Sequence, residues 1–251
     1  MRSFLDESIR EAADLAFRMR REGFEITIKP DASPVTTADM AVHDLLVKRL
    51  RAQYPEDCIL SEEGADPEPA RRSARRAWLI DPIDGTKLFI EGHPDYAILI
   101  GLWEEGEMIA SAAAWPEHGL FVFAEKGAGC VVNGHPASVS SRTIDEARLA
   151  GYGPPFRERT TVRERDVSGA RAIVRILEGD LDGCLMAISP TWGEHDIAFA
   201  LCALAEAGGK VSDGVGRPLR LNAHPRVRPT TIIASNGVIH GDLVDLAQEL
   251  D

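Results

Sequence analysis

An apolar run that leads directly into a stiff acidic turn constrains this chain more than any other feature. Residues 77–80 read Ala-Trp-Leu-Ile, a short strand, and residues 81–86 read Asp-Pro-Ile-Asp-Gly-Thr. Pro82 fixes its own φ and stiffens the turn between the two acids, while Gly85 lets the backbone approach a ligand closely. Free amides at the start of a short helix over 87–91 would attract an anion. The string predicts carboxylates beside an anion-binding turn at a strand end.

Two further acidic groups occupy comparable places along the chain. Glu62 and Glu63 follow the expected strand 58–60, and Asp196 precedes the expected helix 197–207. Strand ends that face a cleft are where α/β-type sheets place their sites. Carboxylates packed together repel one another unless they are protonated or bridged by cations. Because Mg²⁺ prefers such all-oxygen ligand sets, the pattern predicts a metal site.

The overall charge limits the partners of such a site. The chain has 251 residues with 40 acidic and 28 basic side chains, a formal charge of −12. This balance argues against binding a nucleic-acid polymer or an anionic membrane. A small anionic substrate stays possible, because metal ions reverse the local sign of an acidic pocket.

The N-terminal segment and the cysteine pattern favour a cytoplasmic enzyme with reduced thiols. The charged N-terminal segment does not resemble a signal peptide, and no apolar stretch approaches the length of a membrane span. The four cysteines are irregularly spaced, which argues against a disulfide framework and a structural zinc site.

The hydrophobic pattern predicts a mixture of helices and strands. An amphipathic helix is expected over 4–21, and a second over 38–51 with Thr37 as its N-cap. Further strands are expected over 96–103, 108–115, 120–124, 129–132 and 230–235, and further helices over 170–177 and 242–250. Residues 24–36 are a loop or hairpin, 65–76 a surface connection, and 137–160 are ambiguous. We expect one compact unit with two lobes, an N-terminal α+β lobe (1–140) carrying metal-binding motifs and a C-terminal α/β lobe (141–251) contributing Asp196 and substrate contacts.

Four motifs resemble those of the inositol monophosphatase family, the Mg²⁺-dependent, lithium-sensitive phosphatases. They are Lys-Pro-Asp-Ala-Ser-Pro-Val-Thr-Thr-Ala-Asp (29–39), Ser-Glu-Glu (61–63), Trp-Leu-Ile-Asp-Pro-Ile-Asp-Gly-Thr-Lys (78–87), and Asp-Ile-Ala (196–198) followed by Glu-Ala-Gly-Gly (206–209). The resemblance extends from Lys29 to Gly216. It implies an α+β or α/β fold, a layered αβαβα sandwich, in a homodimer.

The resemblance also implies roles for individual residues. Glu62, Asp81 and the Ile83 carbonyl would hold a first Mg²⁺, and Asp81, Asp84 and Asp196 a second. Glu62 would also help to hold a third, weaker ion. The Gly85 and Thr86 amides would contact phosphate, beside Asp84 and Asp196, while Asp39 and Thr86 would orient the attacking water. The implied reaction is hydrolysis of a phosphomonoester by metal-activated water, without a covalent phosphoenzyme.

The segment before Asp196 departs from the family pattern, in which a Trp directly precedes the last metal-binding Asp. Here residues 191–196 read Thr-Trp-Gly-Glu-His-Asp. The ten-residue spacing to Glu206 favours Asp196 as the ligand, with Glu194 as the alternative. For His195 a capping or surface position is favoured over one in the cleft. The departure also motivates an alternative function, a catalytically silent protein that binds metal or a phosphate ligand on the same fold.

The substrate class stays open among inositol monophosphate, histidinol phosphate and 3′-phosphoadenosine 5′-phosphate. Ser189 stands where inositol-type enzymes carry a substrate-binding Glu, and residues 89–94 resemble the histidinol or inositol types. Residues 61–63 are closer to the nucleotide type. Arg165 and Arg171 are candidates for binding a second anionic group, although solvated surface positions are favoured.

Overall fold

Two β-sheets form the framework of the computed structural model, which describes residues 1–153, 156, 168–189, 192–221 and 230–249. The larger sheet has seven strands in sequence order, with β3 and β4 parallel and all later neighbours antiparallel. They are β3 (Cys58–Ser61), β4 (Arg76–Asp84), β5 (Ala97–Glu104), β6 (Glu107–Trp115), β7 (Leu120–Glu125), β8 (Gly129–Val132) and β9 (His135–Pro136).

The smaller sheet has four strands in the order β10-β11-β13-β12, with β10 and β11 parallel and the other neighbours antiparallel. These strands are β10 (Leu149–Tyr152), β11 (Gly183–Ala187), β12 (Lys210–Asp213) and β13 (Thr231–Ser235). β10 lies within the segment 137–160, whose pattern was ambiguous.

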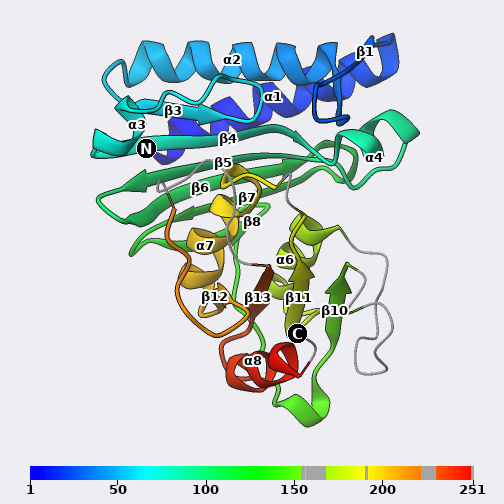
Figure 1. Ribbon diagram of the computed structural model, residues 1–251, viewed down its shortest axis with the longest axis vertical. Helices are drawn as coiled ribbons and strands as arrows, with labels where there is room; N and C mark the ends of the chain where they lie inside the picture. The colour runs from blue at the N-terminus through cyan, green and yellow to red at the C-terminus, as the bar shows by residue number, and fades with distance from the viewer. Residues whose placement is uncertain (154–155, 157–167, 190–191, 222–229, 250–251) are drawn as a thin grey trace.

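Helices cover both sheets and separate them, which gives five layers (Figure 1). α1 (Arg2–Glu22) and α2 (Thr37–Gln53) lie on the outer face of the seven-stranded sheet. α6 (Gly169–Leu177) and α7 (His195–Ala207) fill the space between the sheets, and α8 (His240–Gln248) packs beyond the smaller sheet. The predicted αβαβα sandwich is confirmed.

Each interface between layers is apolar, as the hydrophobic pattern predicts. The α1 stripe, which includes Leu5, Ile9 and Ala16, is buried against the seven-stranded sheet. Trp78 and Trp115 are fully buried on opposite sides of that sheet. Removing such large apolar surfaces from water is the main favourable term in folding, so the layers are held chiefly by these contacts.

A hairpin precedes α2 and sets its first turn. β1 (Ile26–Ile28) and β2 (Pro34–Thr36) pair antiparallel, so the hairpin expectation for residues 24–36 holds. The N-cap of α2 is Thr36 rather than the predicted Thr37. The Thr36 hydroxyl accepts hydrogen bonds from the Ala38 and Asp39 amides, and the Asp39 carboxylate accepts one from the Thr36 amide. This reciprocal arrangement is a capping box.

The connection from β3 to β4 differs from the expectation that residues 65–76 are a surface segment. It contains the short helix α3 (Ala70–Ser73), and the Arg71 side chain on it is completely buried. Asp66 accepts hydrogen bonds from Arg71 Nε and Nη2 at 2.8 and 3.2 Å, which compensates the buried charge. The other short elements within the described part of the chain are α4 (Thr86–Glu91) and two 3₁₀ turns, η1 (Pro116–His118) and η2 (Ile144–Glu146).

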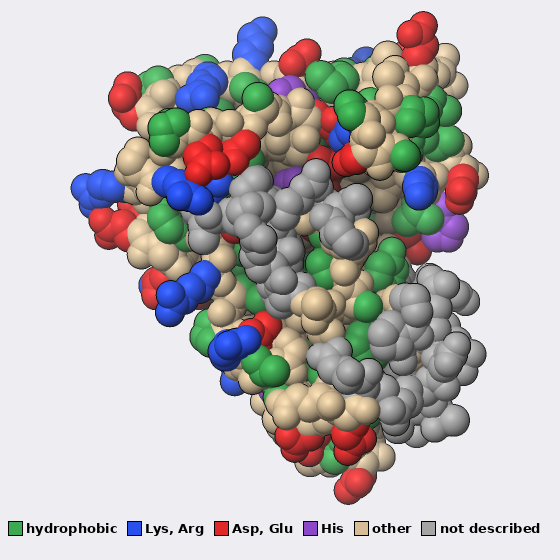
Figure 2. Space-filling model, in the orientation of Figure 1, with side chains coloured by type: hydrophobic (Ala, Val, Ile, Leu, Met, Phe, Trp, Pro, Cys, Tyr) green, Lys and Arg blue, Asp and Glu red, His purple; other side chains and the backbone are tan. Residues whose placement is uncertain are grey.

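No helix among the described residues combines the length and apolar character that crossing a membrane requires. On the face drawn in Figure 2, basic side chains are scattered among acidic ones rather than gathered into one broad patch.

Candidate active site

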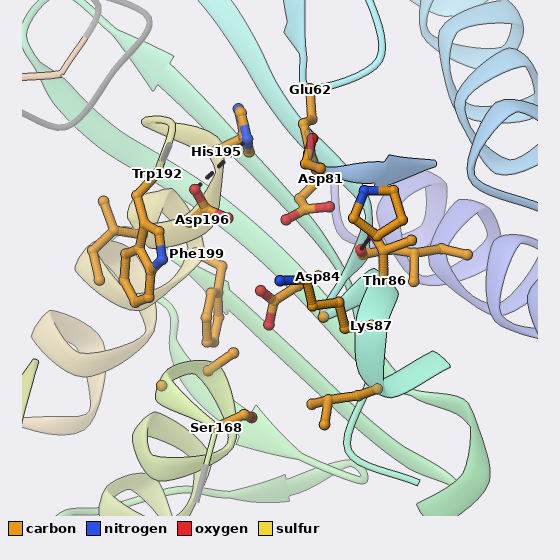
Figure 3. A pocket seen from close by; sticks show the side chains of 18 of the residues that line it. Glu62, Asp81, Asp84, Thr86, Lys87, Ser168, Trp192, His195, Asp196 and Phe199 are labelled. Carbon is orange, nitrogen blue, oxygen red and sulfur yellow. Dashed lines mark hydrogen bonds and ion pairs between the residues drawn. The ribbon is translucent and has the colours of Figure 1, made fainter. Parts of the chain in front are cut away.

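A cleft of about 790 Å³ collects the acidic residues singled out in the sequence. Glu62, Asp81, Asp84 and Asp196 all line it (Figure 3). They come from the end of β3, from β4 and from the first turn of α7, so the cleft lies where the seven-stranded sheet meets the layer of helices between the sheets.

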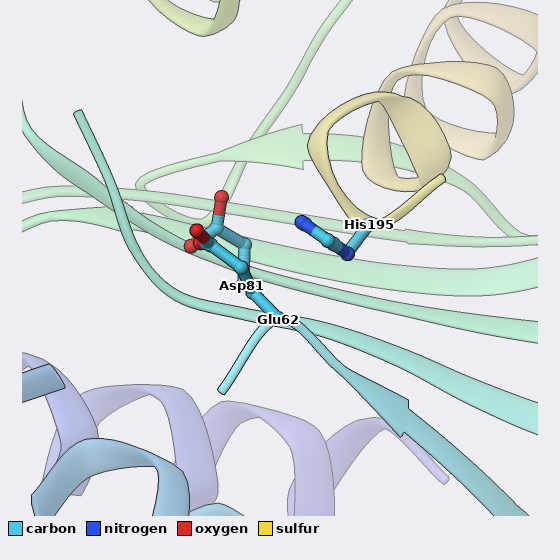
Figure 4. A group of neighbouring side chains, drawn as sticks. All are labelled: Glu62, Asp81 and His195. Carbon is cyan, nitrogen blue, oxygen red and sulfur yellow. The ribbon is translucent and has the colours of Figure 1, made fainter. Parts of the chain in front are cut away.

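Parallel pairing of β3 and β4 places Glu62 beside Asp81. Ser61 pairs with Ile80, and the Glu62 amide donates a 3.1 Å hydrogen bond to the Ile80 carbonyl. Ligand atoms of Glu62, Asp81 and His195 lie within 4.8 Å of one another (Figure 4).

An irregularity in β4 brings Asp81 and Asp84 together. Residues three apart in a regular strand point to opposite faces of the sheet. The register of β4 against β5 shifts between Asp81 and Asp84, around Pro82, which cannot donate a backbone hydrogen bond. Oxygens of Asp81, Asp84 and Asp196 consequently lie within 4.8 Å of one another.

Asp196 is oriented by its own helix start. The Gly193 amide donates a 2.5 Å hydrogen bond to Asp196 Oδ2, and His195 Nε2 lies 3.7 Å from the same oxygen. A negative side chain in the first turn is favoured by the helix dipole. The turn that begins α7 therefore presents Asp196 to the two aspartates of β4.

Thr86 and Asp39 form a second group beside the acidic cluster. The Thr86 hydroxyl lies 3.2 Å from Asp39 Oδ1 and 3.2 Å from the Ile83 carbonyl oxygen. Asp39 is fully buried, and the capping box with Thr36 fixes its carboxylate. Burial raises the pKa of Asp39, although hydrogen bonds from Thr36 and Thr86 oppose the shift.

Gly85 makes the turn between β4 and α4. Its φ of 80° lies in the left-handed region, which favours glycine. A Cβ added there would also lie 3.1 Å from Leu88 Cδ1. The sequence Gly85-Thr86 therefore starts α4 directly after the acidic strand end.

Lys29 from the β1–β2 hairpin reaches the same cleft. Its Nζ lies 3.1 Å from Glu62 Oε1 and 2.7 Å from Glu63 Oε1. Burial raises the pKa of Glu63 to about 7, against the opposing effect of Lys29. Burial alone would lower the pKa of Lys29, but the two glutamates outweigh it and the pKa is raised.

Burial and mutual repulsion among the carboxylates of Glu62, Asp81, Asp84 and Asp196 raise the pKa of two of them. Burial, reinforced by Asp196 and Glu62, raises the pKa of Asp84 to about 8. Burial and then the charge of Glu62 raise the pKa of Asp81 well above its usual range. Both Asp81 oxygens are buried, and no donor among the described residues hydrogen-bonds to them. An all-oxygen set with unsatisfied buried acceptors fits a hard divalent cation such as Mg²⁺.

Comparison with known proteins identifies the family of the chain. The whole chain, residues 1–251, matches the inositol monophosphatase family. The chain belongs to the inositol monophosphatase family.

Two relatives and one solved structure show alignment over most of both chains. A histidinol-phosphatase of Mycobacterium tuberculosis is 30% identical over 94% of both chains. A fructose-1,6-bisphosphatase/inositol-1-monophosphatase of Thermotoga maritima is 30% identical over 86% of this chain and 83% of the relative. A Thermotoga maritima IMPase structure superposes with a TM-score of 0.83 and 26% identity, covering 97% of this chain and 95% of that one. As a member of the inositol monophosphatase family, the chain is a phosphatase.

The structure brings together the residues that resemble the family's ligands and phosphate contacts. The described residues that line the cleft include Glu62, Asp81, Ile83, Asp84, Gly85, Thr86 and Asp196. Asp39 lies behind them and contacts Thr86.

The two neighbours of the last candidate ligand occupy different surroundings. Glu194 is buried, and its charge, after that of Asp66, helps to raise the pKa of Arg71. His195 is buried and lines the cleft, so the favoured capping or surface position was wrong. The local sequence could not reveal this, because the burial arises from packing α7 against the seven-stranded sheet.

Arg171, one of the two candidates for binding a second anionic group, does not join the cluster. Arg171 Nη1 lies 3.7 Å from Glu178 Oε2, and Arg171 is not among the described residues that line the cleft. Ser189 is exposed, and Arg165 lies outside the described residues.

Lys29, Tyr152 and Trp192 are among the cleft-lining residues that were assigned no role from the sequence. Lys29 begins the first family motif, which was its one available signal. Tyr152 falls in the ambiguous segment 137–160, and Trp192 served only as an alignment mark.

Proposed function

We propose that this protein hydrolyses the phosphomonoester of a small metabolite with the help of Mg²⁺. The observation that carries the proposal is the buried carboxylate of Asp81, which lacks a hydrogen-bond donor among the described residues and lies among Glu62, Asp84 and Asp196. Repulsion in such a cluster is relieved by bound cations.

Residues that line the cleft would hold each metal. Glu62, Asp81 and the Ile83 carbonyl would hold one Mg²⁺, and Asp81, Asp84 and Asp196 a second. Glu62 would help to hold a third, weaker ion. When bound, Mg²⁺ supplies positive charge that acidifies water and neutralises the phosphoryl oxygens.

The chain's own residues position the reactants. The Gly85 and Thr86 amides at the start of α4 bind the phosphate, and Asp84 and Asp196 lie beside it. With its own proton directed to Asp39 Oδ1, the Thr86 oxygen accepts a hydrogen bond from the attacking water. The fixed carboxylate of Asp39 holds this arrangement, so its role is to orient Thr86 and the water.

The finer properties rest on the family and on composition. The substrate is one of inositol monophosphate, histidinol phosphate and 3′-phosphoadenosine 5′-phosphate. Relatives named for histidinol-phosphatase and inositol-1-monophosphatase activity support the first two of these substrates. We also propose a lithium-sensitive homodimer in the cytoplasm, which the four free thiols suit. The acidic charge favours these small anionic substrates over nucleic-acid polymers and membranes.

A substrate panel tests the proposal. The purified full-length protein, with Mg²⁺ and then with excess EDTA, is incubated with inositol, histidinol, sugar and nucleotide 3′-phosphates, and free phosphate is measured. We expect Mg²⁺-dependent release from at least one of them. Folded protein that releases no phosphate from any of them would support the catalytically silent alternative.

A further inference from the structure

The cleft has a second half whose chemistry differs from that of the acidic cluster. Away from Asp81 and Asp84 it is lined by Trp192, Tyr152, Ile173 and Met186. Trp192 and Phe199 face the cavity from the side of α7 (Figure 3). One cleft therefore joins an ion-binding end to an aromatic end.

The indole of Trp192 is held in place by close packing. Its Cη2 atom and Met186 Sδ approach Gly169 so closely that a Cβ there would lie 3.2 Å from each. The Tyr152 ring lies on another side, with centroids 6.0 Å apart and planes inclined by 46°. Gly169 thus leaves room for the indole at the start of α6, and Trp192 is half-buried rather than enclosed.

We propose that Trp192 and Tyr152 form a specificity subsite that stacks against a planar heteroaromatic ring in the alcohol part of the substrate. The inference rests on the proposed phosphatase function, because the phosphate of the same molecule occupies the acidic end. It selects ring-bearing esters, such as those of an imidazole or purine alcohol, over polyol phosphates.

The lining explains this preference. Aromatic side chains bind planar rings through stacking, which tolerates different ring types. A polyol placed against the faces of these rings and against Ile173 and Met186 would lose water from its hydroxyls, and these apolar surfaces return no comparable hydrogen bonds. Among the described residues, Ser189 is exposed and Arg171 pairs with Glu178, so these two polar side chains do not change this preference.

Kinetics of Trp192→Ala and Trp192→Phe test the selection. For histidinol phosphate and 3′-phosphoadenosine 5′-phosphate, whichever is turned over, KM should rise about tenfold in Trp192→Ala and less in Trp192→Phe. The kcat/KM for glycerol 2-phosphate should change less than about twofold, since that substrate has no ring to stack. An equal loss on both substrate kinds, or inositol phosphate as the preferred substrate, would overturn the inference.

Fluorescence supplies a readout that does not depend on turnover. Adenosine or histidinol should quench tryptophan emission in the wild type and in Trp103→Phe, a matched change at a half-buried Trp outside the described cleft lining, but not in Trp192→Phe. Quenching that survives in Trp192→Phe, or none in the wild type, would contradict the subsite. If ring compounds quench but no phosphate is released, the subsite stands and the phosphatase proposal fails.

Discussion

Asp84 is subject to strong charge repulsion within the site. Its carboxylate is crowded by Asp81 and Asp196, and burial with the charges of Asp196 and Glu62 raises its pKa to about 8. Replacing it with Asn should reduce phosphate release roughly 100-fold or more, as expected when a preorganised charge at a reacting centre is lost. The melting temperature without metal should be unchanged or higher, because repulsion is relieved.

The matched control is Asp44→Asn, the same change on the exposed face of α2. It should leave both phosphate release and melting temperature within error. Undiminished turnover in Asp84→Asn would remove Asp84 from the catalytic centre.

Single residues also show what the sequence could predict. The sequence indicated Asp81, Asp84 and Asp196 as candidate metal ligands, because a strand pattern, a turn with Pro and Gly, and a helix start surround them. The burial of His195 and Arg71, and the contact of Lys29 with Glu63, were not predictable. These features depend on contacts between segments far apart in the chain, which no local pattern encodes.

The first turn of α2 links a structural element to the site. Thr36→Ala removes the hydroxyl that caps the helix and contacts Asp39, so the free energy of unfolding should fall by about 1–2 kcal/mol. Thr36→Ser keeps the hydroxyl and should restore most of it. Urea unfolding of the three proteins measures this, and equal stability of Thr36→Ala and wild type would show that the cap contributes nothing.

The start of α8 predicts a pH dependence of stability. His240 bridges Ser235 Oγ and Ser212 Oγ, each at 2.8 Å, and burial with the charge of Lys210 lowers its pKa from 6.5 to about 4. Between these values the unfolded chain binds the proton and the folded chain does not. Stability from the neutral imidazole is thus present above about pH 6.5 and lost as the pH falls toward 4, by at most about 3 kcal/mol.

Urea unfolding at pH 7 and pH 5 measures this loss against His240→Asn, which retains hydrogen-bonding capacity without the titration. The variant should lose less stability on acidification than the wild type. An identical loss in both proteins would assign the pH dependence to other groups.

The bounds of helices and strands show which elements a local sequence pattern can predict and which depend on pairing with distant segments. The helices with clear apolar periodicity, α1 and α7, lie close to their predicted ranges. β4 continues to Asp84, beyond the predicted end at residue 80, because pairing with β5 resumes after the irregularity. β10 was ambiguous because its four residues, Leu-Ala-Gly-Tyr, are too short to show alternation and depend on pairing with β11.

At the scale of the whole molecule, the site lies between the seven-stranded sheet and the layer of helices that separates the two sheets. Glu62, Asp81 and Asp84 come from the seven-stranded sheet, whereas Asp196 comes from a helix between the sheets. We keep residues 1–140 and 141–251 as proposed lobes of one unit, with the metals bridging them. Mg²⁺ should then raise the melting temperature of the wild type by several degrees but have little effect on Asp84→Asn, because binding to the folded state alone stabilises it. Differential scanning fluorimetry measures both, and equal shifts would place the ion elsewhere.

The layered fold was predictable because its motifs resemble those of a known family over most of the chain. Apolar periodicity alone indicated the longer helices and the strands β5 and β6. The order of the four-stranded sheet was not available from periodicity, since β13 lies between β11 and β12 and pairs with strands that are distant in the chain.

The most direct test of the account is phosphate release from the best panel substrate, measured across a Mg²⁺ titration for wild type, Asp196→Asn and Glu194→Gln. We predict saturable Mg²⁺ dependence in the wild type and little turnover in Asp196→Asn. Glu194→Gln should keep the wild-type Mg²⁺ requirement, because the charge of Glu194 acts on Arg71. Full activity in excess EDTA, or undiminished turnover in Asp196→Asn, would contradict it.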